Sequence, residues 1–134
     1  ANSKNPLCYN GDIFTKSDYH KFRENFPQTE SMMIGRGLLT NPALVREIKG
    51  GPTITKEEIM AFHDKLYEEF LVLFQSETNT MFKMKELWVY LGRMFPEKER
   101  QIKKIKKIAK NNITSAGIIH QKWLKGFLFF IFFS

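Results

Sequence analysis

The hydrophobic pattern changes its period part-way along the chain. Up to residue 52, short apolar runs at residues 6–9 and 31–34 each precede a glycine-bearing turn and a helical segment. Strands that alternate with helical segments are typical of βαβ units and a parallel sheet. From residue 53 onward, apolar residues recur at spacings of three and four, which predicts amphipathic helices. We therefore predict an α/β region over residues 1–52 and an all-helical domain over residues 53–110, with residues 111–134 unassigned.

Local signals indicate where the helices of the first region begin and end. Thr15 is a predicted N-cap, Asp18 completes a capping box, and this helix is expected to end before Pro27. Asn41 is predicted to cap a short helix that has Pro42 at its first position and ends at the following glycine pair.

Three helices are predicted in the second region. A capping box of Thr55 and Glu58 opens the first helix, and Pro96 opens the third. The predicted apolar stripes are, in chain order, Ile59, Phe62, Leu66, Phe70 and Leu73, then Met81, Met84, Trp88, Leu91 and Phe95, then Ile102, Ile105 and Ala109. Short connections between amphipathic helices predict a helical bundle, with the methionine and tryptophan side chains in its core rather than on an RNA-stacking surface.

Basic residues concentrate in this helical region. Residues 83–110 contain ten Lys and Arg against three Asp and Glu, whereas residues 1–82 contain nine against eleven. The formal net charge of +7 favours an anionic partner. We predict contacts with RNA phosphates from Lys83, Lys85, Arg93, Lys103, Lys106 and Lys107. The alternative is a solvated helix face that has no partner.

The remaining composition argues against other sites. A single cysteine, Cys8, excludes an internal disulfide and is typical of a reducing compartment such as the cytoplasm; we expect it to be buried as a small apolar side chain. His20, His63 and His120 are far apart, so no metal site is predicted, and surface or helix-face positions are expected for them. Residues 1–5 are polar and predict no signal peptide. The apolar run at residues 127–133 is far shorter than the roughly 20 residues of a membrane span.

The candidate chemistry lies in the two glycine-bearing turns, Asn10–Asp12 and Gly35–Gly37. In parallel α/β folds, ligands bind at the carboxyl ends of strands. Glycine lets backbone N–H groups approach a phosphate, and Arg36 adds a charge-assisted contact. A phosphate site is one interpretation of these turns, and two ordinary tight turns are the other.

These turns also carry a family resemblance. Tyr9–Ile13 (YNGDI), Met33–Gly37 (MIGRG), Asn41–Pro42 and Arg46–Ile48 resemble, in order and spacing, the last two βα units of tRNA-dihydrouridine synthases, and Lys83–Leu91 (KMKELWVYL) is more loosely similar to their helical domain. The resemblance implies the C-terminal part of a (β/α)8 TIM-type barrel followed by a tRNA-binding helical domain. It also implies that the phosphate of FMN is held by Asn10, Gly11, Asp12, Gly35 and Arg36.

The activity implied by the resemblance is the reduction of uridine to dihydrouridine in tRNA, with FMN as cofactor and NADPH as reductant. In that family the catalytic cysteine, and the Lys and His that position flavin and uridine, belong to earlier barrel loops that this sequence does not contain. No catalytic residue is therefore assigned, and Cys8 cannot inherit the role because it lies within a strand. We expect a fragment, or the product of an incomplete gene, that is inactive alone.

Two other functions remain open. Another phosphate-binding barrel enzyme, such as a dihydroorotate dehydrogenase-like flavoprotein, would share the turns but needs no basic helical domain. A non-catalytic RNA-binding remnant would use only the helices and would bind tRNA independently of flavin.

Overall fold

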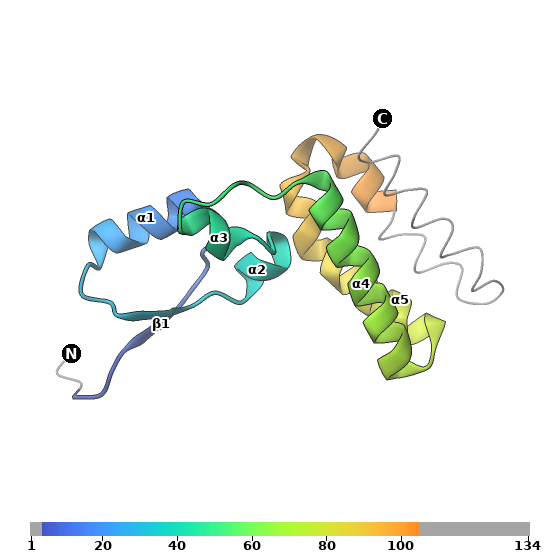
Figure 1. The fold of residues 1–134 in the computed structure, drawn as a ribbon, viewed down its shortest axis with the longest axis horizontal. Coiled ribbons are helices and arrows are strands. Elements are labelled where there is room, and N and C mark those ends of the chain that lie inside the picture. Colours follow the sequence, from blue (N-terminus) through green and yellow to red (C-terminus); the bar gives the residue numbers. More distant parts are fainter. Residues whose placement is uncertain (1–3, 105–134) are drawn as a thin grey trace. The chain divides into compact units, whose positions relative to one another are not determined.

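The computed structural model describes residues 4–104 and divides the chain into two compact units, one up to Ile54 and one from Thr55 (Figure 1). The predicted boundaries at residues 52 and 110, and the roles of the two regions, stay predictions. The expectations for Ile105, Lys106, Lys107, Ala109, His120 and residues 127–133 concern positions outside the described residues.

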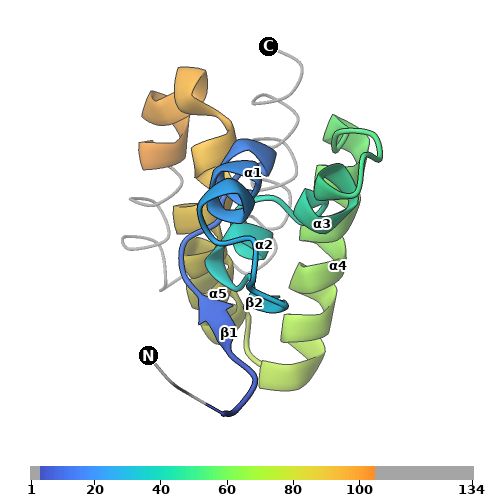
Figure 2. The same cartoon turned by 90° about the vertical axis from the view of Figure 1, so that its left-hand side faces the viewer.

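The first unit contains a βαβ arrangement and two further short helices. Its elements are β1 (Cys8–Asn10), α1 (Lys16–Asn25), β2 (Ser31–Met33), α2 (Arg36–Thr40) and α3 (Leu44–Ile48). The two strands pair in parallel, with Tyr9 opposite Met32 (Figure 2). The predicted parallel sheet is therefore confirmed for these two strands.

Helix α1 begins as its sequence predicts. The Thr15 hydroxyl accepts a hydrogen bond from the Asp18 backbone N–H at 3.1 Å, and the Asp18 carboxylate accepts one from the Thr15 N–H at 2.9 Å. This capping box satisfies N–H groups that have no partner within the helix. The helix packs against β1 through the rings of Phe22 and Tyr9, whose centroids are 3.9 Å apart.

The two faces of the sheet differ in exposure. Side chains alternate between the faces of a strand, and Tyr9 and Met32 are half-buried on one face. Cys8 and Met33 occupy the alternate positions and are exposed, Met33 to 57%. The expected burial of Cys8 is therefore wrong, because an apolar sequence run does not determine whether both faces of its strand are covered.

The helical segment after β2 also differs from the prediction. The turn expected at residues 35–37 is instead the start of α2, and Asn41 follows the end of that helix. The Asn41 side-chain oxygen accepts from the backbone N–H of Ala43 at 3.0 Å, which forms a local turn around Pro42. As a result α3 begins only at Leu44. The predicted short helix before the glycine pair is confirmed, but its predicted start at Pro42 with Asn41 as the cap is wrong.

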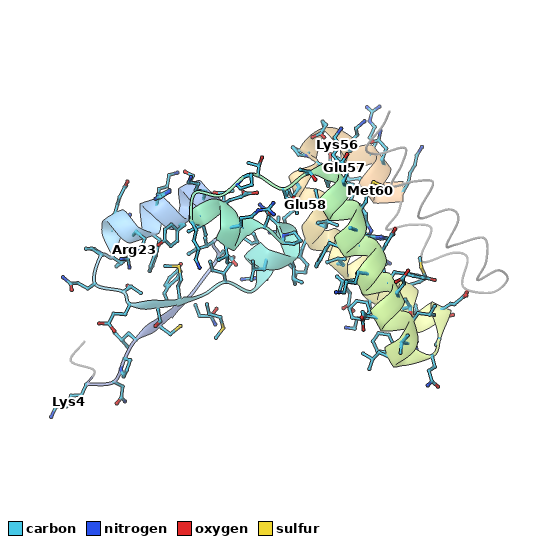
Figure 3. The ribbon with its side chains drawn as sticks, in the orientation of Figure 1. Lys4, Arg23, Lys56, Glu57, Glu58 and Met60 are labelled. Carbon is cyan, nitrogen blue, oxygen red and sulfur yellow. The ribbon has the colours of Figure 1, made fainter. Side chains whose placement is uncertain are left out.

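The second unit is built on two long helices, α4 (Lys56–Phe74) and α5 (Glu77–Leu91), which pack against each other as a hairpin. The predicted capping box at the start of α4 is present. Figure 3 shows Glu57 and Glu58 in the first turn, where carboxylates interact favourably with the helix dipole. Gln75, with φ of 48°, ends α4 in the left-handed conformation, and the Ser76 side chain caps α5.

The buried face of α4 is rotated from the predicted stripe. The buried residues of the hairpin are Ile59, His63 and Tyr67 from α4, and Thr80, Met84, Leu87, Trp88 and Leu91 from α5. Leu73, predicted in the stripe, is 69% exposed. Burial raises the pKa of Tyr67, and the negative charge of Glu77 adds to this shift. The predicted apolar stripe is therefore confirmed for α5. In α4 the prediction followed the most hydrophobic residues, whereas the buried face also contains His63 and Tyr67.

His63 lies on a helix face, as expected, but on the buried one. Its Nδ1 lies 3.3 Å from Asp64 Oδ1, and its ring centroid is 5.8 Å from that of Trp88. The Nε2 atom of His63 and the Nε1 atom of Trp88 are buried and have no hydrogen-bond partner among residues 4–104. Within this part of the chain, the desolvation of these two atoms is not offset by a hydrogen bond.

Two short 3-10 turns, η1 (Gly92–Met94) and η2 (Pro96–Lys98), connect α5 to helical residues 99–104. Pro96, predicted to open the third helix, is instead the first residue of η2, which directly precedes the helical residues 99–104. Ile102, in the predicted apolar stripe of that helix, is buried. The three-helix bundle stays a prediction, because residues 105–109 of its third helix are outside the described range. Within residues 4–104, no helix is long and apolar enough to cross a membrane, and no group of three potential metal ligands occurs.

Candidate phosphate-binding site

The two predicted turns meet at the carboxyl ends of β1 and β2. The parallel register places Asn10 opposite Met33, so both strands end at the same edge of the sheet. Beyond that edge, Nη2 of Arg36 lies 2.8 Å from Oδ1 of Asp12. An ion pair therefore joins the loop after β1 to the start of α2.

The loop that contains Asp12 is held in place by hydrogen bonds to the side chain of Asp18, in the first turn of α1. The Asp18 carboxylate accepts from the backbone N–H groups of Phe14, at 3.1 Å, and Thr15, at 2.9 Å. Burial alone would raise the pKa of Asp18, but the hydrogen bonds with Thr15 and Phe14 and the charge of Lys21 outweigh it and lower the pKa. Asp18 is therefore ionised at neutral pH and holds the loop from α1.

Gly37 sets how closely the two loops approach. A Cβ at this position would lie 2.0 Å from the carbonyl oxygen of Ile13 and 3.0 Å from Cδ2 of Leu44, and both of those residues are buried. No side chain fits there without moving the backbone. Sequence reasoning grouped Gly37 with the phosphate turn, whereas the structure gives it a packing role.

The side chains and glycines at this edge fit a phosphate group. A Cβ built on Gly35 would meet nothing within 4 Å, so the backbone there faces open space. The Arg36 side chain is 60% exposed, and its contact with Asp12 uses one nitrogen of a group that has five N–H donors. Asn10 is exposed at the end of β1, next to Gly11. Arg36 and the Gly35 backbone can therefore bind an anion, while Asp12 orients Arg36.

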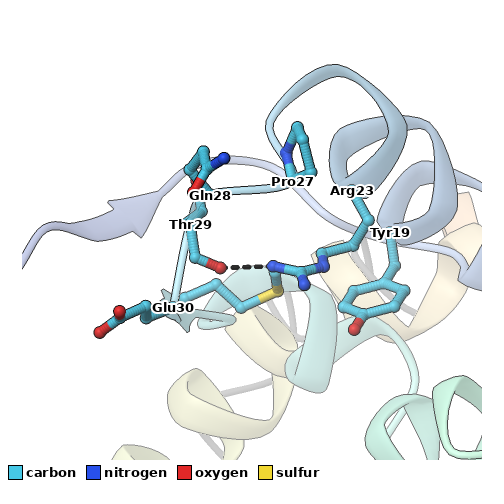
Figure 4. Close-up of a pocket in the computed structure, with 7 residues that line it drawn as sticks. Tyr19, Arg23, Pro27, Gln28, Thr29 and Glu30 are labelled. Carbon is cyan, nitrogen blue, oxygen red and sulfur yellow. Dashed lines mark hydrogen bonds between the residues drawn. The ribbon is translucent and has the colours of Figure 1, made fainter.

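The opposite end of the sheet contains a separate polar cluster (Figure 4). Arg23 donates a hydrogen bond from Nη1 to the Thr29 carbonyl oxygen, and Tyr19 and Glu30 line the same pocket of about 440 Å³. Arg23 is half-buried and fastens the turn between α1 and β2. It therefore has a structural role in the first unit.

Among the predicted RNA contacts that the structure describes, Lys83, Arg93 and Lys103 are exposed. Lys83 pairs with Glu86 and Lys103 with Glu99, each at 2.8 Å. The guanidinium carbon of Arg93 lies 5.6 Å from the Tyr90 ring centroid, and Lys85 is half-buried. Exposed ion pairs of this kind contribute only about 0–1 kcal/mol, so a phosphate can compete for the lysines.

Comparison with known families decides what this arrangement belongs to. The family model of dihydrouridine synthase (Dus) matches residues 1–121, which is most of the chain. The chain belongs to the dihydrouridine synthase family. The parallel β1–β2 pair is consistent with part of the TIM barrel of dihydrouridine synthases. The family match excludes the alternative of a dihydroorotate dehydrogenase-like barrel.

Individual relatives agree with this family. The chain is 31% identical over 99 residues to a tRNA-dihydrouridine(16) synthase of Pseudomonas putida strain KT2440, across 70% of this chain and 30% of the relative. It is 33% identical over 97 residues to a tRNA-dihydrouridine(16) synthase of Neisseria meningitidis serogroup B, across 69% of this chain and 28% of the relative. The chain thus spans less than a third of the length of these dihydrouridine synthases. No solved structure matches it.

Proposed function

We propose that the chain acts within a flavin-dependent tRNA-dihydrouridine synthase, in which the first unit holds the phosphate of FMN and the second unit contacts tRNA. The observation that carries this proposal is the pairing of Asp12 with Arg36 at the carboxyl ends of two parallel strands, in a chain of this family. In barrel enzymes, loops at that edge form phosphate sites.

Each residue of the first unit has a defined task in this proposal. Arg36 binds phosphate oxygens through its exposed N–H donors, and the open space at Gly35 allows the group to approach the backbone closely. Gly11 is the second proposed backbone contact, on the side that the Tyr9 ring leaves uncovered. Asn10 contributes a side-chain amide from the end of β1, and Asp12 holds Arg36 in place. Bound FMN supplies the hydride that reduces the uridine ring, with NADPH as the reductant.

The second unit supplies the electrostatic contacts with tRNA. RNA is held largely through its phosphates and its shape, so a segment rich in cations is suited to this task. The proposed contacts are Lys83, Lys85, Arg93, Lys103, Lys106 and Lys107. The excess of ten basic over three acidic residues between positions 83 and 110 supports this assignment.

A chimera tests the proposed function. In the Neisseria meningitidis relative, the matching 97-residue segment is replaced by this chain. We expect the chimera to purify with FMN and to convert uridine to dihydrouridine in unmodified tRNA. A folded chimera that binds tRNA but neither retains FMN nor forms dihydrouridine would favour a non-catalytic RNA-binding role instead.

A further inference from the structure

A pocket opens in the second unit where α5 gives way to the two 3-10 turns. It has a volume of about 430 Å³ and is lined by Val89, Arg93, Phe95, Glu99 and Ile102, among others. Of these lining residues, Ile102 is only 4% exposed, whereas Val89 is 43% exposed. Pockets of this size accommodate small organic groups.

The bend of the chain creates this pocket. Gly92 lies so close to the helix at residues 99–104 that a Cβ there would come within 2.8 Å of Ile102 Cγ2. Phe95 separates η1 from η2 with φ of −126° and ψ of 62°, and Pro96 starts the next turn. The aromatic ring of Phe95 and the aliphatic side chains are thus brought to one side of the bend, together with Arg93.

We propose that this pocket receives an unpaired nucleobase of the tRNA. The inference rests on the proposed function, because it assumes that RNA lies against the second unit. Proteins recognise unpaired RNA bases by stacking them on aromatic rings and on arginine guanidinium planes, and both groups line the pocket. The position of Arg93 near the Tyr90 ring, 5.6 Å from its centroid, limits the orientations that its guanidinium can adopt.

The chemistry of the lining favours a base over a phosphate. Val89, Phe95 and Ile102 offer no donors to phosphate oxygens, and the Glu99 carboxylate would repel them. A base has a flat apolar face that can pack against these side chains. It also has N–H groups that can donate hydrogen bonds to a carboxylate. Oε1 of Glu99 lies 2.8 Å from Nζ of Lys103, so Lys103 is beside the pocket. There it could contact the phosphate next to the bound base.

Charge complementarity brings RNA to this surface. The ten basic residues between positions 83 and 110 surround the pocket in sequence. These residues attract the RNA phosphates, whatever the bases are. The pocket adds to the affinity only when a base is present. Removal of the base and removal of the phosphate contacts are therefore separable by experiment.

The test uses the whole chain and two labelled probes, a seven-nucleotide oligouridylate and the same ribose-phosphate backbone without bases. At fixed salt, wild type should bind the oligouridylate about five- to 150-fold more tightly, which corresponds to stacking of one base. Phe95→Leu keeps an apolar side chain but removes the ring, and it should abolish this preference without changing affinity for the abasic probe. The matched control is Phe82→Leu, since Phe82 is 45% exposed on α5 and is absent from the pocket lining.

A second variant, Arg93→Lys, keeps the proposal testable if Phe95→Leu does not fold. Arg93→Lys keeps the charge but removes the planar group, so it should reduce the base preference while the salt dependence stays unchanged. Equal binding of both probes by wild type would overturn the pocket and leave the RNA-binding function standing. If wild type bound neither the oligouridylate nor the abasic probe, both the pocket proposal and the RNA-binding function would be overturned. Self-association that Phe95→Leu abolishes, in sedimentation experiments, would assign the pocket to a second copy of the chain and overturn the proposal.

Discussion

Arg36 Nη2 lies 2.8 Å from Asp12 Oδ1, so the first charged residue after β2 is paired with the first charged residue after β1. Both side chains are largely exposed, at 60% and 48%, and such a pair contributes little to stability. Its effect is positional, because it restricts the rotamers of Arg36 at the edge where a phosphate would bind.

Arg36→Gln should weaken the binding of FMN but not of riboflavin, which lacks the phosphate. Loss of a charge-assisted hydrogen bond costs about 1.5–3 kcal/mol, or roughly 10- to 150-fold in affinity. Fluorescence titration of the chimera with both flavins measures the difference. Lys49→Gln is the control, because Lys49 is an exposed cation at the end of α3. Parallel losses for FMN and riboflavin would argue against phosphate contact by Arg36.

Gly37→Ala should destabilise the first unit, whereas Gly35→Ala should not. The added methyl at Gly37 would lie 2.0 Å from the Ile13 carbonyl oxygen, while the one at Gly35 meets nothing within 4 Å. Overpacking of this kind costs about 1–3 kcal/mol or more. Thermal unfolding of the full chain compares the two variants. In the chimera, Gly35→Ala should still reduce affinity for FMN if the phosphate approaches that backbone, and equal stability of the two variants would contradict the packing role of Gly37.

Asp18→Asn should lower stability at neutral pH and have less effect in acid. The folded state lowers the pKa of Asp18, so its stabilising contribution is complete above the unfolded pKa of about 3.9 and is lost as the pH falls through the folded pKa. We expect a difference of about 1 kcal/mol at pH 7, typical of a helix cap, that closes below about pH 4. Chemical denaturation at pH 7 and in acid measures it, with Glu24→Gln as a control on the same helix. A pH-independent difference would exclude the charge of Asp18 as the cause.

Replacement of Lys103, Lys106 and Lys107 by Gln should flatten the salt dependence of tRNA binding. Each phosphate contact contributes roughly −0.7 to −0.9 to the slope of log K against log salt, so the slope should change by about two to three units. The same substitutions at Lys16, Lys21 and Lys49 remove equal charge from the first unit. If both triple variants lose affinity equally and keep the wild-type slope, the lysines of the second unit are only solvated and do not contact phosphate.

His63→Leu should leave the free energy of unfolding unchanged or raise it by up to about 1–3 kcal/mol. The substitution removes a buried Nε2 atom that has no hydrogen-bond partner in the part of the chain that the structure describes, and the desolvation penalty of that atom disappears with it. Ile59→Ala, in the same core, should instead cost about 2–5 kcal/mol because it leaves a cavity. A large loss of stability in His63→Leu would show that the imidazole makes a contact essential to the hairpin.

Local chemistry was predictable from the sequence where the interacting groups are close in the chain. The capping boxes at Thr15 and Thr55 depend on residues three positions apart, and both formed as expected. The parallel pairing of β1 and β2 followed from the order of strand and helix, because a crossover helix favours a parallel pair.

Features that depend on distant partners were not predictable in the same way. The exposure of Cys8 depends on what covers its strand, and the burial of His63 depends on packing against Trp88. Helix α2 includes Gly37 in its first turn despite the low helix propensity of glycine, and this residue lies directly against Ile13. For the candidate site, the sequence predicted the residue types, whereas the contact between Asp12 and Arg36 required the fold.

The short connection between α4 and α5 also bears on how the chain folds. Gln75 and Ser76 alone separate the two helices, so their contacts close a small loop and need little chain entropy. The parallel pairing of β1 with β2 requires that the connecting segment with α1 first brings β2 alongside β1. Low contact order favours rapid folding, so the hairpin should form first in refolding kinetics and supply a structured nucleus while the strands are still unpaired.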